Sequence, residues 1–139
     1  MPPSLTSLNL HSNQLSGVIP DLSGLDKLQW LRLQGNQLSG TIPSTLGDMA
    51  SLTRLWLHEN VLSGPIPAWL GGLTKLERLW LSDNMLTGEI PEELGDLSDH
   101  SLAQWRLGGN DLTGCVPQGL ADVADNDLDS LGLEVCTDS

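Results

Sequence analysis

A repeat of about two dozen residues constrains the fold of this chain more than any other feature. Five segments begin at Leu5, Leu28, Leu52, Leu76 and Leu102, at intervals of 23, 24, 24 and 26 residues. The third segment reads LTRLWLHENVLSGPIPAWLGGLTK, and the others share its LxxLxLxxNxL, Ser or Thr, Gly, x, Ile-Pro core with small departures. A motif that returns at a fixed spacing predicts one structural unit folded in the same way each time.

The leucine spacing predicts a short strand in every unit. Leucines in LxLxx alternate with polar residues, so one face of each strand points inward. One such strand cannot bury its leucines alone, but identical neighbours stacked beside it form a parallel sheet with a continuous core. The chain has no Phe or Tyr and is 39% hydrophobic, which agrees with one aliphatic packing solution used many times.

Three further columns recur after the strands. The asparagines are Asn13, Asn36, Asn60, Asn84 and Asn110. The glycines are Gly17, Gly40, Gly64, Gly88 and Gly114. The prolines are Pro20, Pro43, Pro67, Pro91 and Pro117. The asparagines could contact a ligand or satisfy backbone groups inside the turn; we interpret them as internal. Glycine allows the bend, and proline restricts the return path to an extended form.

The pattern LxxLxLxxNxLSGxIPxxLGxL resembles the plant-type subclass of leucine-rich repeats. This subclass occurs in receptor-kinase ectodomains, in polygalacturonase-inhibiting proteins and in bacterial and algal secreted proteins. The resemblance covers roughly residues 5 to 136. It implies an α/β repeat solenoid, a right-handed coil with a concave parallel β-sheet and convex 3₁₀ or extended segments. We predict a single leucine-rich-repeat domain over residues 1–139.

The C-terminal stretch, about residues 115–136, departs from the repeat and is predicted to cap it. Apolar side chains there can cover the last coil, and Cys115 and Cys136 resemble the disulfide of caps in bacterial and algal members. Two buried free thiols are the alternative. A disulfide indicates an oxidising compartment, so we expect an extracellular or cell-surface location. No signal peptide is visible.

The N-terminal end shows no comparable cap in the sequence. The chain is then either a fragment of a longer protein or covered at that end by something else. We expect a monomer, or weak self-association through the uncapped N-terminal end.

The acidic run Asp125-Asn126-Asp127-Leu128-Asp129 raises the possibility of a calcium loop. An EF-hand would need Gly and Glu where Ser130 and Cys136 stand. A solvated acidic turn or a helix N-cap is the preferred interpretation. We expect no metal and no cofactor.

The outward-facing strand positions carry the main functional signal. All four arginines and three of the five tryptophans fall there. The candidate ligand-binding residues are Trp30, Arg32, Arg54, Trp56, His58, Arg78, Trp80 and Arg106. Trp and Arg are frequent at interface hot spots, whereas the alternative is that the arginines stack on the tryptophans and simply cover the sheet. Trp105 occupies a leucine position and is predicted to be core, and His100 is predicted to lie in a bulging surface loop.

Composition and motifs narrow the function classes. A net charge of −12 with only six Lys and Arg excludes nucleic-acid binding. No apolar run approaches the ~18 residues of a membrane span, and no catalytic motif is present, so we expect no enzyme. Protein or peptide binding through the concave face is the preferred functional hypothesis. Recognition of an acidic polysaccharide, or a structural fragment of a longer receptor-like protein, is the alternative. The irregular column Val18, Thr41, Pro65, Glu89 and Cys115 disfavours an ice-binding surface.

Overall fold

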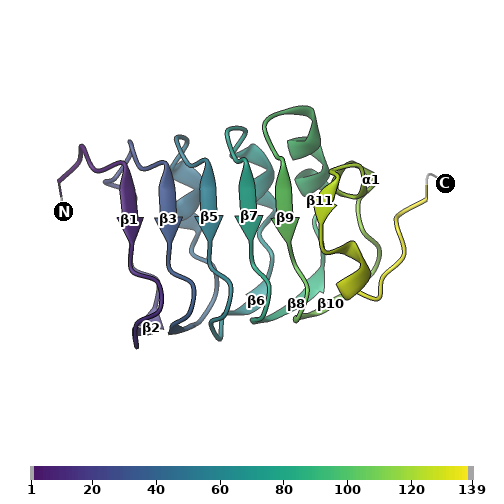
Figure 1. Cartoon of the computed structure of the whole chain (residues 1–139), viewed down its shortest axis with the longest axis horizontal. Coiled ribbons are helices and arrows are strands. Elements are labelled where there is room, and N and C mark those ends of the chain that lie inside the picture. The colour runs from purple at the N-terminus through teal and green to yellow at the C-terminus, as the bar shows by residue number, and fades with distance from the viewer. Residues whose placement is uncertain (1, 138–139) are drawn as a thin grey trace.

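Each leucine-rich segment forms one short strand of a six-stranded parallel sheet. The computed structural model describes residues 2–137. The sheet runs in the order β1-β3-β5-β7-β9-β11 along the length of the molecule (Figure 1). Its strands are β1 (Ser7–Asn9), β3 (Trp30–Arg32), β5 (Arg54–Trp56), β7 (Arg78–Trp80), β9 (Gln104–Arg106) and β11 (Asp125–Asn126). Every connection between neighbouring strands is one full lap of the coil, and the predicted solenoid fold is confirmed.

The strand centres stack into one continuous apolar column. Leu31, Leu55 and Leu79 are paired in register and none of them is exposed to solvent. Trp105 continues the column on β9 and is fully buried, as predicted. Its indole Nε1 donates a hydrogen bond to the Leu120 carbonyl at 2.8 Å, so the polar edge of the ring is satisfied inside the core.

The asparagine column forms an internal ladder of hydrogen bonds. Asn60 donates from Nδ2 to the carbonyls of Leu57 in its own coil and Leu33 in the coil before, at 3.1 and 3.0 Å. Its Oδ1 accepts from the Leu38 amide at 3.0 Å. Asn84 repeats this arrangement one coil later. These side chains satisfy the backbone where the chain turns away from the sheet, so the internal interpretation holds.

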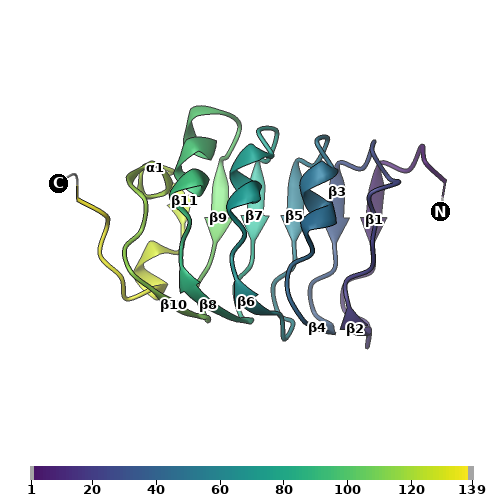
Figure 2. The ribbon, with the colours of Figure 1, turned by 180° about the vertical axis from the view of Figure 1, so that it is seen from behind.

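The opposite side of the coil carries short strands and 3₁₀ helices (Figure 2). The strands are β2 (Ser16–Val18), β4 (Gln37–Ser39), β6 (Ser63–Pro65), β8 (Met85–Glu89) and β10 (Asp111–Thr113). The 3₁₀ helices are η1 (Ser44–Asp48), η2 (Ala68–Gly72) and η3 (Glu92–Asp99). Each 3₁₀ helix starts directly after the proline of its repeat, which holds the extended backbone at the entrance.

The enlarged fourth repeat differs from the expectation of a bulging loop. Its extra residues lengthen η3, which is eight residues long where η1 and η2 have five. His100 follows directly as the C-terminal cap residue and is exposed. Leu94 and Leu97 are buried like Leu70 and Leu73 one coil earlier, so the added residues Ser98 and Asp99 extend the helix on its solvent side and bring no new core contact.

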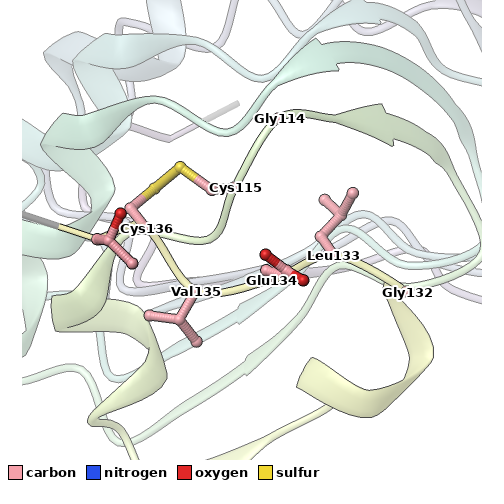
Figure 3. A pocket seen from close by; sticks show the side chains of 8 residues that line it. Gly114, Cys115, Gly132, Leu133, Glu134, Val135 and Cys136 are labelled. Atoms are coloured by element: carbon pink, nitrogen blue, oxygen red, sulfur yellow. A yellow bond between two sulfur atoms is a disulfide. The ribbon is translucent and has the colours of Figure 1, made fainter.

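The last coil is closed by a cap that contains α1 (Gln118–Ala121), β11 and η4 (Leu128–Ser130). The predicted disulfide between Cys115 and Cys136 is present (Figure 3). Val116 and Val135 form a parallel bridge beside it. The Asp127 carboxylate accepts from the amides of Leu107 and Gly108 at 2.9 and 2.7 Å. In the coil before, the Leu81 amide, which is the counterpart of Leu107, donates to the Arg106 carbonyl of the next strand. Within residues 2–137, no helix is long and apolar enough to cross a membrane.

Candidate ligand-binding surface

The outward side chains of the six-stranded sheet form the surface that we call the concave face. On β3, β5 and β7 a fully buried central leucine lies between two half-buried neighbours, so the predicted alternation sets which side chains face out. Strand register arranges them in two rows. The first row is Ser7, Trp30, Arg54, Arg78, Gln104 and Asp125. The second is Asn9, Arg32, Trp56, Trp80 and Arg106.

Arginine–tryptophan stacking covers part of this face. The Arg32 guanidinium lies 5.1 Å from the ring centre of Trp30 and 4.2 Å from that of Trp56. Arg54 stacks on the same Trp30 ring at 4.3 Å. Such contacts stabilise the arginines without neutralising them, since the ring supplies only a quadrupole. The self-stacked arrangement and a charged surface are therefore both present.

The C-terminal end of the face is closed by its own hydrogen bonds. Trp80 Nε1 donates to Gln104 Oε1 at 2.7 Å, and Gln104 Nε2 donates to Asp125 Oδ2 at 2.6 Å. Arg106 Nη2 donates to Asp125 Oδ1 at 2.6 Å, and its guanidinium lies over the Trp80 ring. The hydrogen bond from Arg106, and next that from Gln104, lowers the pKa of the Asp125 carboxyl. Arg106 is thus already neutralised.

Asp125 is the residue of this face that sequence reasoning missed. It lies on β11, a sixth strand that the five-repeat reading did not contain. A signal was available, because Val123 and Leu128 are spaced like Leu102 and Leu107. Asn126, however, stands where the central leucine or tryptophan of a strand is expected, and this hid the strand.

The middle of the face keeps unneutralised charge. Arg54 and Arg78 are paired in register on adjacent strands, and like charges opposite one another are destabilising. Among the described residues 2–137 the one ion pair is that of Arg106, so Arg32, Arg54 and Arg78 have no carboxylate partner there. Within the described chain no aromatic ring stacks on Arg78 either, so of the three it is the one with neither a carboxylate nor a ring as partner.

Several donors of the same region are also unpaired. Arg32 Nε, Arg54 Nε and Trp56 Nε1 are covered by neighbouring atoms and have no hydrogen-bond partner within the described chain. Orphaned buried donors cost free energy. Their concentration on β3 and β5 contrasts with the satisfied network on β9 and β11. The hydrogen-bonding side chains of the face are therefore paired with one another at its β9–β11 end, whereas donors in its middle lack partners.

His58 follows β5 at the edge of this region. Its ring lies 4.8 Å from that of Trp80, and the Trp56 and Trp80 rings are 5.7 Å apart. Burial lowers the pKa of His58, against the opposing charges of Glu59 and Asp83. The side chain is therefore neutral at pH 7 and adds an aromatic surface rather than a fifth positive charge.

Outside this face, the described residues form no evident metal site or acid–base pair. Within residues 2–137, no three His, Cys, Asp or Glu side chains are placed to hold a metal ion together. A hollow of about 460 Å³ lies beside the disulfide, lined by residues 114–115 and 132–137 (Figure 3). Glu134 is the sole ionisable side chain of that lining, so no acid–base pair meets there.

Comparison with known proteins agrees with the architecture. Models described as leucine-rich repeat match residues 4–25 and 27–86. No curated protein matched the sequence. Among solved structures, the BIR2 ectodomain from Arabidopsis thaliana is 36% identical with a TM-score of 0.84, over 93% of this chain and 68% of that chain.

Two further structures extend the comparison. The HAESA receptor-kinase ectodomain from Arabidopsis, solved with an IDA peptide hormone, is 38% identical with a TM-score of 0.79, over 91% of this chain and 22% of that one. A plant ice-binding protein is 36% identical with a TM-score of 0.81, over 91% of this chain and 41% of that one. The chain thus spans less than half of either protein. It belongs to the leucine-rich-repeat family, with repeats of the type found in plant receptor ectodomains.

Proposed function

We propose that this chain is a non-catalytic, extracellular binding module that holds an acidic protein segment or peptide on its concave face. One observation carries the proposal. Arg32, Arg54 and Arg78 have no carboxylate partner among residues 2–137, although the chain contains 18 carboxylates. A ligand carboxylate would relieve the repulsion between Arg54 and Arg78 and would occupy their donors.

The shape of the face suits an extended chain. Neighbouring strands of a sheet lie about 4.8 Å apart, so successive coils offer binding positions at a spacing that an extended peptide can follow. Trp56 and Trp80 are half-buried and in contact with one another, so they present rigid apolar surface with little entropy to lose on binding. Arg and Trp together are the residue types that most often dominate interface energetics.

A similar protein of known structure supports the choice of a peptide as the class of ligand. HAESA was solved with a peptide hormone bound, and it shares the repeat at 38% identity over nearly all of this chain. The disulfide supports the extracellular part of the proposal, since such bonds persist in oxidising compartments.

Glycan recognition is the second candidate. The tilted pair of Trp56 and Trp80 rings resembles a platform on which sugar rings stack, and the arginines would contact the carboxylates of an acidic polysaccharide. This candidate uses the same face, so only the chemistry of the ligand separates the two.

We do not propose ice binding for this chain, although one similar structure is a plant ice-binding protein. A flat repeated surface of that kind needs like residues in register. The variable position before Ile-Pro differs in every coil, and reads Val18, Thr41, Pro65, Glu89 and Cys115.

The test compares a peptide array with a glycan array. The peptides are extended segments with stepwise changes in Asp, Glu and aromatic content, and the glycans include uronic-acid oligosaccharides. We expect acidic peptides to bind and the affinity to fall with added salt, since the attraction is between charges. Capture of uronic-acid glycans without any peptide would favour the second candidate.

Charge reversal at matched positions locates the site. Arg78→Glu should weaken peptide binding by about tenfold or more, whereas Lys75→Glu makes the same charge change in an exposed turn before β7 and should have little effect. The double variant Trp56→Ala, Trp80→Ala should weaken binding further. If that double variant folds normally and binds every probe as the parent does, the concave face is not the binding site.

A further inference from the structure

Trp80 is held in place on the concave face by side chains of the strands that follow it. Its indole Nε1 donates to Gln104 Oε1 at 2.7 Å, and the Arg106 guanidinium lies 5.5 Å from its ring centre. Asp125 accepts from both of these residues at 2.6 Å, from Gln104 Nε2 on one carboxylate oxygen and from Arg106 Nη2 on the other. One carboxylate of the cap therefore fixes two of the side chains that surround the Trp80 ring.

The aromatic side chains beside Trp80 form an apolar surface. The Trp56 and His58 rings lie 5.7 and 4.8 Å from the Trp80 ring, and we call Trp56, His58 and Trp80 the aromatic platform. Trp80 Nε1 is already bonded to Gln104. Trp56 Nε1 and His58 Nδ1 are covered by neighbouring atoms and have no partner within the described chain. Because these three nitrogens are closed to a ligand, the platform presents ring carbon atoms, and these favour an apolar or aromatic side chain.

Positive charge lies one row before the aromatic platform. Arg54 and Arg78 precede Trp56 and Trp80 by two residues on the same two strands. At a rise of about 3.3 Å per residue, the two rows start about 6.6 Å apart. An extended peptide has the same rise and directs residues i and i+2 to one side. Two ligand side chains at this spacing therefore reach both rows at once.

The cap limits where a ligand carboxylate can bind. Gln104 and Asp125 continue the row of Arg54 and Arg78 on the next two strands. Both Gln104 side-chain groups are already hydrogen-bonded. The Asp125 side chain is 53% exposed, and its negative charge repels an acidic ligand group. A ligand carboxylate is therefore directed to Arg54 and Arg78.

We propose that the ligand carries an acidic side chain and, two residues away, an apolar or aromatic one. The acidic side chain lies on Arg54 and Arg78, and the apolar one lies on the aromatic platform. Gln104 and Asp125 are positioning residues, because they hold the Trp80 ring that contacts the ligand. The motif presupposes the proposed peptide binding on the concave face, and it adds the pair of side chains that the peptide presents and their spacing.

A peptide series at low salt tests the motif. Ten-residue peptides of Ser and Thr, blocked at both ends, carry one Glu and one Leu at separations of one, two or three positions, and a further peptide carries Glu alone. Tryptophan fluorescence of the protein gives the dissociation constants, since the peptides contain no tryptophan. We expect the separation of two to bind about fivefold more tightly than the others, because it alone buries the leucine on the platform.

The outcomes separate the motif from the proposed function. Equal affinity at all separations and for Glu alone overturns the motif and leaves peptide binding intact. Failure of every acidic peptide to bind, in this series and in the array, overturns both.

A double-mutant cycle tests the positioning role of Gln104. Gln104→Leu removes the acceptor for the Trp80 indole and the donor to Asp125. We expect it to weaken the Glu-x-Leu peptide about threefold and to leave the Glu-only peptide unchanged. Gln37→Leu is the matched control, because Gln37 is exposed on β4 at the opposite side of the coil.

The Trp80 indole proton supplies a second measurement on the protein without ligand. In NMR spectra its signal should shift and exchange faster with solvent in Gln104→Leu, and it should stay unchanged in Gln37→Leu. An equal loss of affinity for both peptides in Gln104→Leu, or an indole signal that does not move, overturns the positioning role.

Discussion

Replacing Asn60 with alanine should destabilise the fold far more than the same change at Asn13. Asn60 is buried at 7% exposure, and its Oδ1 is the acceptor for the Leu38 amide. In the variant that amide loses its partner, whereas the Leu33 carbonyl still accepts from Asn36 and the Leu57 carbonyl still accepts from Asn84. The damage is therefore concentrated on one orphaned donor.

The magnitude follows from this count of partners. A buried donor left unsatisfied costs about 1–3 kcal/mol, and each weakened bond adds about 0.5–1.5 kcal/mol. With the Leu33 and Leu57 carbonyls as the two weakened bonds, the sum for Asn60→Ala is about 2–6 kcal/mol in the free energy of unfolding. Asn13 is exposed, and within the described chain its side chain bonds only to the carbonyls of Leu10 and His11, so Asn13→Ala should cost under about 1 kcal/mol.

Urea unfolding followed by circular dichroism measures both variants against the parent. The midpoint should fall much further for Asn60→Ala than for Asn13→Ala at an unchanged slope, because the surface exposed on unfolding is nearly the same. If the two variants lose equal stability, the asparagine column does not act by satisfying buried backbone, and the ladder argument is refuted.

Three further predictions follow from individual contacts. Gly71→Ala should destabilise by about 1–3 kcal/mol, because its new methyl would clash with the backbone carbonyl of Glu93. Gly72→Ala meets nothing within 4 Å and should be neutral or slightly stabilising by thermal melting. Reduction of the Cys115–Cys136 disulfide, with 21 residues of separation, should lower stability by about 3 kcal/mol, and an unchanged unfolding midpoint in reductant would contradict this. Burial holds the pKa of His58 below its ordinary 6.5, so the unfolded chain binds more protons just below that pH. Stability is then complete above pH 6.5 and falls as the pH drops below it; NMR titration should place the His58 midpoint below 6.5, and His58→Gln should remove this part of the pH dependence.

The repeated unit and the two sides of its strands could be predicted from the amino-acid pattern alone. Leucine spacing is a local property, and identical units have one way to bury it, so the parallel sheet, the buried Trp105 and the internal asparagines could all be predicted. The Cys115–Cys136 disulfide was predictable as well, from resemblance. The grouping of Arg54, Trp56 and Arg78 on one face follows from the same period of two.

The hydrogen bonds and ion pairs between neighbouring coils could not be predicted in this way, because they depend on the folded arrangement. Asp125 pairs with Arg106 because the cap adds a sixth strand, although Asn126 occupies its centre. Asp127 caps the two amides that follow β9, through contacts about 20 residues away in sequence. Such contacts depend on the position and rotamer of a side chain in another coil, which no local pattern encodes. For the same reason, which arginines remain unpaired became visible only in three dimensions.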